Sequence, residues 1–174
     1  WFLTMCAADG ISVEWVESGA PIRFCTTLIE GAEGRTTELV EESLPVAPET
    51  SDDLVKRFAD LVKQADAVLL SGTVAAGIAQ GTMTRFARIA WDVGTHLYLD
   101  IKKQDLLECL EFHPVCAKPN LEELAQTLGI PYAEVRDEES ARKLVEEQGK
   151  RFFSEYGTYL VVTRGAKSTL YWDG

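Results

Sequence analysis

The sequence has few basic residues and no long hydrophobic run. Its 174 residues include 17 lysines and arginines against 28 aspartates and glutamates, which gives a formal net charge of -11. Because binding a nucleic-acid backbone requires clustered cations, we expect no nucleic-acid partner. No apolar stretch approaches the ~20 residues that cross a membrane, and no basic segment precedes an apolar one as in a signal peptide. We therefore expect a soluble, cytoplasmic protein without a membrane partner.

Cysteine and histidine are also scarce, which limits the metal sites that the chain can build. There are 4 cysteines and 2 histidines, with no Cys-x-x-Cys pair. The nearest grouping is Cys109, His113 and Cys116, and a zinc site would need a fourth ligand at standard spacing. We expect all cysteines to be reduced thiols that are buried or half-buried, and His96 to be structural.

The first ~45 residues have the composition and periodicity of extended structure. The expected strands lie at 11–17, 22–29 and 35–41, with a turn over 31–34. Polar side chains in these segments indicate a small antiparallel sheet with at least one solvated face. Pro45 and Pro48 mark a linker, so we expect one domain over 1–45 and a second over 46–174.

After the linker, helical and strand patterns alternate. A helix capped by Ser51 or Asp52 is predicted by its apolar spacing, and the continuous apolar run 67–70 is typical of a buried parallel strand. Further helices are expected at 80–92, from 106, at 120–128 and at 139–155, and further strands at 97–101, 115–118, 159–163 and 169–172. This alternation favours βαβ units around a mainly parallel sheet, an α/β fold.

Polar residues follow the apolar runs at several junctions. The junctions are 71–77, 100–102, 118–123 and 163–165. Ligands of open parallel sheets bind outside the carboxyl ends of the strands, so these residues are the candidates for a site. Their hydroxyls, carboxylates, amide and cations suit a phosphorylated ligand with a divalent ion. The alternative is that solvated loops carry such residues without any function.

The segment 118–124 has the highest density of these polar groups. In one interpretation Asn120 caps a helix and Glu123 completes a capping box. In another, the same two side chains meet a hydrated Mg²⁺ or a phosphate at the start of the helix. The two interpretations are compatible.

Several motifs follow one another in a characteristic order. They are Gly10-Ile11, Arg23 in Pro-Ile-Arg-Phe-Cys-Thr-Thr, Thr36–Leu39, Ser71–Gly77, Leu99-Asp100, Lys118–Leu124 and Thr163–Ala166. Together they resemble the PfkB (ribokinase-like) carbohydrate kinases, and most closely the phosphosugar branch of 1-phosphofructokinase and tagatose-6-phosphate kinase. The resemblance implies a ribokinase-like three-layer core with a small antiparallel β-lid over the sugar. In this family the lid often pairs with a second copy, so it also implies a homodimer.

The resemblance further implies roles for individual residues. Arg23 would hold the phosphate already on the sugar through its bidentate guanidinium, with help from the Thr73 hydroxyl. The other implied sets are Asp100, Asn120 and Glu123, which organise Mg²⁺ and the transferred phosphates, and Lys118, Thr163 and Gly165, which flank ATP. The substrates would be a sugar phosphate and Mg²⁺-bound ATP, and no direct protein ligand of the metal is assigned. For Arg23 the alternative is a solvated strand face.

Two family motifs are missing from the sequence. The Gly-Gly-x-x-Asn sugar-binding segment would precede Trp1, and the Gly-Ala-Gly-Asp motif with the catalytic base would follow Gly174. We therefore assign no catalytic residue and expect the middle segment of a longer kinase, incomplete at both ends and without turnover by itself. In addition, Ala75-Ala76 replaces Pro-Pro, and Lys103 and Ser168 stand where glycine is common, which matters if the backbone requires a positive φ.

Two other interpretations stay open. The chain could be a non-catalytic ligand-binding or dimerisation module derived from such a kinase, since exposed edge strands pair readily. It could also be a truncated product whose parallel sheet lacks its first strand and folds poorly. The missing motifs favour the module, whereas the retained Asp100, Asn120 and Glu123 favour the kinase.

Overall fold

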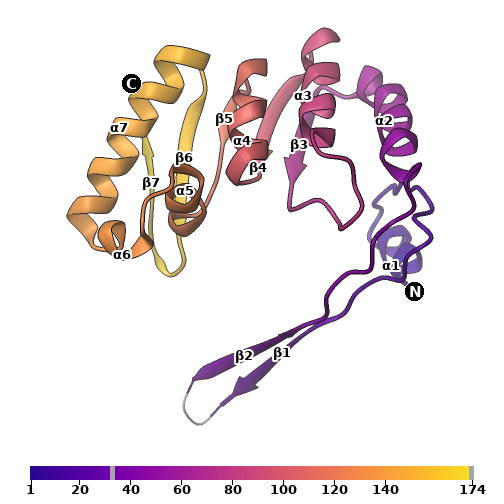
Figure 1. Ribbon diagram of the computed structural model, residues 1–174, viewed down its shortest axis with the longest axis horizontal. Helices are drawn as coiled ribbons and strands as arrows, with labels where there is room; N and C mark the ends of the chain where they lie inside the picture. The colour runs from indigo at the N-terminus through magenta and orange to yellow at the C-terminus, as the bar shows by residue number, and fades with distance from the viewer. Residues whose placement is uncertain (32–33, 173–174) are drawn as a thin grey trace. The chain divides into compact units, whose positions relative to one another are not determined.

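The computed structural model describes residues 1–31 and 34–172 and divides into two compact units. The first unit comprises Trp1–Leu54 and Val74–Ala79, and the second comprises Val55–Thr73 and Gln80–Gly174. Figure 1 gives the element labels used from here on.

The first unit contains helix α1 (Phe2–Ala8) and an antiparallel hairpin of strands β1 (Cys25–Glu30) and β2 (Arg35–Val40) (Figure 1). The register runs from the pair Cys25–Val40 to the pair Glu30–Arg35, and every residue of both strands is exposed. The predicted antiparallel sheet is thus confirmed for these two strands. Residues 32 and 33 of the predicted turn lie outside the described residues.

Three expectations for this unit were wrong. Residues 2–8 form a helix, because leucine, methionine and alanine favour helical backbone. Residues 11–17 belong to no sheet of the described chain, so their alternating pattern produces no strand. Cys25 is exposed rather than buried or half-buried, because the hairpin has no layer packed against it in its own unit.

A close backbone approach explains one glycine of the Ser71–Gly77 motif. The Val46 amide donates to the Ala76 carbonyl at 2.8 Å, and the Ala79 amide donates to the Ser51 hydroxyl at 2.8 Å. Gly77 has φ +87°, and a Cβ there would lie 2.8 Å from backbone atoms of Val46. Only glycine fits this position without displacing the backbone.

The second unit is built on a five-stranded sheet with the order β3-β4-β5-β6-β7. Its strands are β3 (Ala67–Ser71), β4 (His96–Asp100), β5 (Cys116–Ala117), β6 (Tyr159–Arg164) and β7 (Lys167–Trp172). The first four are parallel, and β7 returns antiparallel to β6 through a short turn. The predicted α/β class with a mainly parallel sheet is confirmed.

Helices and short 3₁₀ turns connect the strands of this sheet (Figure 1). They are α2 (Thr50–Leu61), which begins in the first unit, η1 (Val62–Gln64), α3 (Thr82–Asp92), α4 (Lys103–Cys109), η2 (Leu110–Phe112), α5 (Leu121–Leu128), α6 (Tyr132–Val135) and α7 (Glu138–Tyr156). Among the α-helices in this group, only the short α6 was not expected. The core is formed by alternate strand residues such as Leu99 and Leu160 and by helix residues such as Leu106, Leu124 and Phe152. Among the described residues, no helix has the length and apolar character needed to span a membrane.

The burial of β3 differs from the expectation. The strand forms as predicted, but only Leu70 is buried, whereas Leu69 is 63 % exposed. A run that is apolar at every position is typical of a strand covered on both faces, and in this unit the Leu69 side of the strand is open.

Candidate functional site

The polar junctions of the second unit lie along one edge of its sheet. Ser71 and Asp100 end neighbouring parallel strands and pair in register. Farther along the edge, Asn120 and Thr163 form a parallel bridge, and the Thr163 amide donates to the Pro119 carbonyl at 3.2 Å. The carboxyl ends of the parallel strands therefore bring together residues that are far apart in the sequence.

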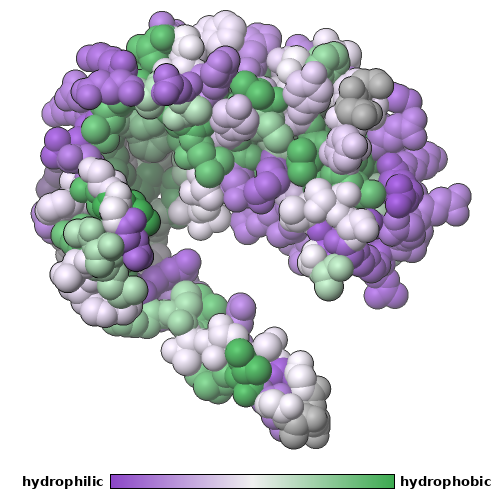
Figure 2. Space-filling model, turned by 180° about the vertical axis from the view of Figure 1, so that it is seen from behind, coloured by the Kyte–Doolittle hydropathy of each residue, from purple (hydrophilic) through white to green (hydrophobic). Residues whose placement is uncertain are grey.

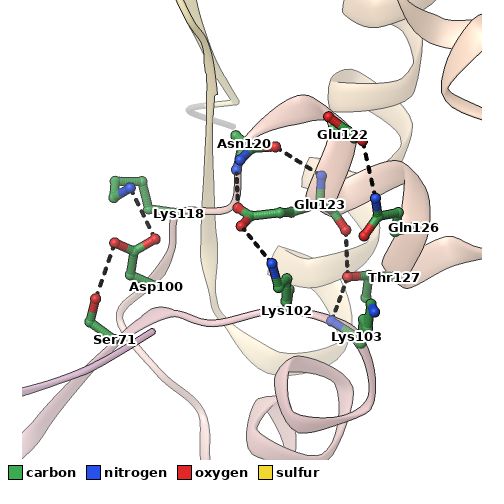
Figure 3. A network of polar contacts seen from close by, with 10 residues as sticks. All are labelled: Ser71, Asp100, Lys102, Lys103, Lys118, Asn120, Glu122, Glu123, Gln126 and Thr127. Carbon is green, nitrogen blue, oxygen red and sulfur yellow. Dashed lines mark hydrogen bonds and ion pairs between the residues drawn. The ribbon is translucent and has the colours of Figure 1, made fainter. Parts of the chain in front are cut away.

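Asp100 and Lys118 form an ion pair at this edge (Figure 3). The Lys118 Nζ lies 3.0 Å from the Asp100 Oδ1, and the Ser71 hydroxyl donates to the Asp100 Oδ2 at 3.4 Å. Both charged side chains remain partly exposed, so solvent screens their attraction and other ions can reach them. A phosphate could therefore compete for Lys118, and a cation could compete for Asp100.

Asn120 and Glu123 form the predicted capping box at the start of α5 (Figure 3). The Glu123 amide donates to the Asn120 Oδ1 at 2.9 Å, and the Asn120 amide donates to the Glu123 Oε2 at 3.0 Å. The other carboxylate oxygen of Glu123 lies 3.3 Å from the Lys102 Nζ. The structural role of the pair is thus confirmed, and its role toward Mg²⁺ stays a prediction.

A left-handed residue connects this edge to α5. Lys103 has φ +58°, a conformation that costs a side-chain-bearing residue roughly 1–2 kcal/mol. Its amide donates to the Thr127 hydroxyl at 2.8 Å, and that hydroxyl donates to the Glu123 carbonyl at 2.6 Å. The sequence marked Lys103 as a position where glycine is common in the family, and the positive φ gives the physical reason. Ser168 is not among the positive-φ residues of the described chain.

Sequence reasoning missed Thr127 as a member of this network, and it included Lys102 in a candidate junction without identifying its partner. Thr127 lies four residues after Glu123 in α5, so helical periodicity places both on one face, but nothing local indicates the bond to Lys103. Lys102 lies in the junction 100–102 directly after β4, and its partner Glu123 is 21 residues away in the chain. Their pairing is a tertiary contact.

The remaining predicted residues are distributed over both units. Gly165 has φ +60° in the turn between β6 and β7, and Thr73 is exposed in the irregular segment after β3. Arg23 belongs to the first unit, where it is exposed just before β1. The roles of Arg23 and Thr73 in substrate binding stay predictions.

Arg164 anchors the turn that contains Gly165. Its side chain is only 4 % exposed, its Nη1 lies 2.6 Å from the Glu138 carboxylate, and its Nε donates to the Ser168 carbonyl at 2.8 Å. The hydrogen bonds from Arg164 are the main cause that lowers the pKa of Glu138, the first residue of α7. The turn between β6 and β7 is thereby attached to α7.

The Cys109, His113 and Cys116 grouping is not a metal site. No group of three or more potential metal ligands occurs among residues 1–31 and 34–172. Burial raises the pKa of Cys109 to about 12, which keeps it a thiol, and the His113 Nδ1 lies 2.9 Å from the Tyr156 carbonyl oxygen. Both residues therefore have structural roles.

Comparison with known proteins identifies one matching family. A sequence model of the pfkB family carbohydrate kinases matches residues 2–174. The tetrameric inhibited form of phosphofructokinase-2 from Escherichia coli has a TM-score of 0.78 at 18 % identity, with 98 % of this chain and 54 % of that chain covered. The same enzyme in complex with fructose-6-phosphate gives 0.77 at 18 % identity, with 98 % and 55 % covered. The possible 1-phosphofructokinase of Thermotoga maritima gives 0.69 at 16 % identity, with 86 % and 45 % covered.

These matches confirm the ribokinase-like fold expected from the sequence. The chain spans about half the length of the solved structures that it matches. At such low identities the structural likeness concerns the fold alone.

Proposed function

The chain belongs to the pfkB family of carbohydrate kinases, and we propose that it is a segment of an ATP-dependent kinase that phosphorylates a hydroxyl of a sugar or sugar phosphate. The observation that carries this proposal is the polar edge of the sheet, where Lys118, Asp100 and the Asn120–Glu123 capping box lie side by side (Figure 3). Cations and carboxylates that remain partly exposed can exchange their present partners for a phosphate and a metal ion.

In this proposal each group at the edge has a defined task. Lys118 and Thr163 bind the phosphates of ATP, and Gly165 lets the nucleotide approach the β6–β7 turn. Asp100, Asn120 and Glu123 offer carboxylate and amide oxygens, the donor set that a hydrated Mg²⁺ prefers. When bound, Mg²⁺ would neutralise charge on the transferred phosphate. Phosphoryl transfer depends mainly on such positioning and electrostatic stabilisation.

The substrate is proposed to be a phosphosugar of the kind used by 1-phosphofructokinase or tagatose-6-phosphate kinase. Arg23 would hold the phosphate already present, because a guanidinium binds a phosphate through two parallel hydrogen bonds. Thr73 would add a hydroxyl contact. The structure of phosphofructokinase-2 with fructose-6-phosphate supports a phosphorylated sugar as the substrate class within the family.

The domain division is part of the same proposal. Residues 1–45 would act as the β-lid over the sugar, and residues 46–174 would form the nucleotide-binding core. The hairpin of β1 and β2 and the mainly parallel sheet of the second unit support this division. A cytoplasmic location, where ATP and phosphosugars are found, is proposed with it.

Nucleotide binding by the 174-residue chain tests the proposal. We expect isothermal titration calorimetry to detect ATP binding in the presence of Mg²⁺, and Lys118→Met to weaken it about tenfold or more, since a charge-assisted hydrogen bond is lost. Lys143→Met, in an exposed position of α7, is the matched control and should not change the affinity. Absence of binding, or equal affinity in both variants, would contradict the proposal.

A second candidate function is a dimerisation module, favoured by the hairpin of the first unit. Leu28, Ile29, Leu39 and Val40 are all more than half exposed, so both faces of the hairpin present apolar side chains. We expect a dimer in sedimentation experiments, and Ile29→Glu to dissociate it, while Glu38→Gln on the same face should not. A dimer combined with no ATP binding would favour the module over the kinase.

A further inference from the structure

The Glu123 carboxylate divides its two oxygens between two partners (Figure 3). Its Oε2 accepts a hydrogen bond from the Asn120 amide at 3.0 Å, as the capping box of α5 requires. Its Oε1 lies 3.3 Å from the Lys102 Nζ. The contact with Asn120 stabilises the start of the helix, so Oε1 is the oxygen that can exchange its partner.

The contact between Lys102 and Glu123 is not what ties the turn after β4 to α5. The next residue, Lys103, donates its amide to the Thr127 hydroxyl at 2.8 Å, and this hydroxyl donates to the Glu123 carbonyl at 2.6 Å. Neither bond involves the Lys102 side chain. The side chains of Lys102 and Glu123 are 33 % and 27 % exposed, so water and ions reach the pair and screen its attraction.

A second carboxylate at the same edge is also paired with a lysine. The Lys118 Nζ lies 3.0 Å from the Asp100 Oδ1. A divalent cation that approaches either carboxylate therefore meets a positive charge beside it and is repelled by that charge. The two pairs differ in one respect, because Lys118 is proposed to bind the phosphates of ATP, whereas Lys102 has no task in that proposal.

We propose that Lys102 is an internal competitor of Mg²⁺. Its ammonium occupies the Glu123 oxygen that the metal ion needs, so the metal ion binds this oxygen by displacing the ammonium. The inference rests on the proposed role of Glu123 toward Mg²⁺. A displaced ammonium stays at the edge on its flexible side chain, where a phosphate can neutralise it. Lys102 therefore favours a metal ion that arrives together with phosphate groups and disfavours the free ion.

Binding of Mn²⁺ without nucleotide tests this inference in the native protein purified from its own cells. Mn²⁺ prefers the same oxygen ligands as Mg²⁺, and the electron paramagnetic resonance signal of unbound Mn²⁺ reports its affinity. Lys102→Met and Lys102→Gln both remove the ammonium. We expect each to tighten Mn²⁺ binding about fivefold or more, because the competing charge is lost. Lys102→Arg retains a cation and should bind Mn²⁺ as weakly as the original protein.

Two further variants control for indirect effects. Figure 2 shows hydrophilic residues spread over the visible surface, and the loss of any surface lysine alters the electrostatic potential of the chain. Lys143→Met removes a lysine of α7 that pairs with Glu147, and it should leave Mn²⁺ affinity within about twofold of the original. In a Glu123→Gln background, Lys102→Met should likewise change the affinity less than about twofold, since the contested oxygen has lost its charge.

The same variants separate this inference from the proposed function. If Glu123→Gln weakens Mn²⁺ binding but neither Lys102→Met nor Lys102→Gln tightens it, the inference is overturned and the proposed role of Glu123 stands. If Glu123→Gln has no effect even in the Lys102→Met background, both are overturned. A gain from Lys102→Met that persists with Glu123→Gln, or that Lys143→Met reproduces, would also overturn the inference.

Discussion

The amide of Lys103, held at φ +58°, donates a hydrogen bond to the Thr127 hydroxyl at 2.8 Å. The same hydroxyl donates to the Glu123 carbonyl, so a single oxygen connects the turn after β4 to the first half of α5. Lys102, the residue before the turn, lies 3.3 Å from the Glu123 carboxylate. The strained conformation of Lys103 thus accompanies the placement of a cation beside the proposed magnesium-organising residue.

Lys103→Gly is expected to stabilise the chain. Glycine adopts a positive φ without steric cost, so we expect the free energy of unfolding to rise by about 0.5–1 kcal/mol in urea denaturation. Lys143→Gly is the matched control, because Lys143 lies inside α7, where glycine should cost about 1 kcal/mol. If both substitutions destabilise equally, the left-handed conformation of Lys103 carries no strain.

Thr127→Val is expected to release the turn. Valine keeps the shape of threonine but removes the hydroxyl, so the Lys103 amide loses its acceptor, at a cost of about 1–2 kcal/mol. Hydrogen exchange of the Lys103 amide, followed by NMR, should accelerate in this variant. Thr127→Ser retains the hydroxyl and should keep the amide protected. Equal exchange in both variants would mean that the hydroxyl does not hold the turn.

Much of the fold could be predicted because it depends on local periodicity. The helical spacing of α2 and α7, the short apolar strands and the capping box of Asn120 and Glu123 all follow from neighbours within a few residues. The alternation at 11–17 misled the prediction, since a strand also requires a partner strand, which the local pattern does not contain.

The contacts that complete the candidate site are of longer range. Arg164 pairs with Glu138 across 26 residues, and Lys102 pairs with Glu123 across 21. Each of these residues also fits a solvated loop or helix terminus, so only the topology identifies its partner. Positions where the family commonly has glycine were more informative than these charged residues. Lys103, which replaces such a glycine, and Gly77, which is one, both have a positive φ.

Glu123→Gln separates the capping role from the proposed role toward Mg²⁺. Glutamine can still accept the Asn120 amide, so the melting temperature should change little. The loss of charge should raise the Mg²⁺ concentration required for half-maximal ATP binding about tenfold, measured by calorimetry at fixed ATP. Glu122→Gln, one position earlier in the same helix, is the control. An unaltered Mg²⁺ titration would leave Glu123 with its capping role alone.

Arg23→Ala tests the proposed phosphosugar site in the native protein purified from its own cells. The loss of a bidentate phosphate contact should raise the KM for the sugar phosphate at least tenfold, while the KM for ATP stays within about twofold. Arg35→Ala, which removes an arginine of the same hairpin region that pairs with Glu30, should leave both constants unchanged. An unchanged KM for the sugar phosphate would remove Arg23 from the site.

The Arg164–Glu138 pair predicts a dependence of stability on pH. The hydrogen bonds from Arg164 lower the pKa of Glu138 below its ordinary value of 4.5. A carboxylate whose pKa is depressed in the folded protein contributes stability at pH values above its pKa in the unfolded chain. This contribution is lost as the pH falls through its pKa in the folded protein. We therefore expect Glu138→Gln to lower the urea midpoint at about pH 7, with the difference from the original chain shrinking as the pH falls below 4.5. Glu147→Gln, on the exposed surface of the same helix, is the control and should give a much smaller difference. The difference in urea midpoint between Glu138→Gln and the original chain could instead stay constant down to about pH 3. That result would show that the ionised carboxylate does not stabilise the buried Arg164 side chain, and that packing holds the β6–β7 turn on α7.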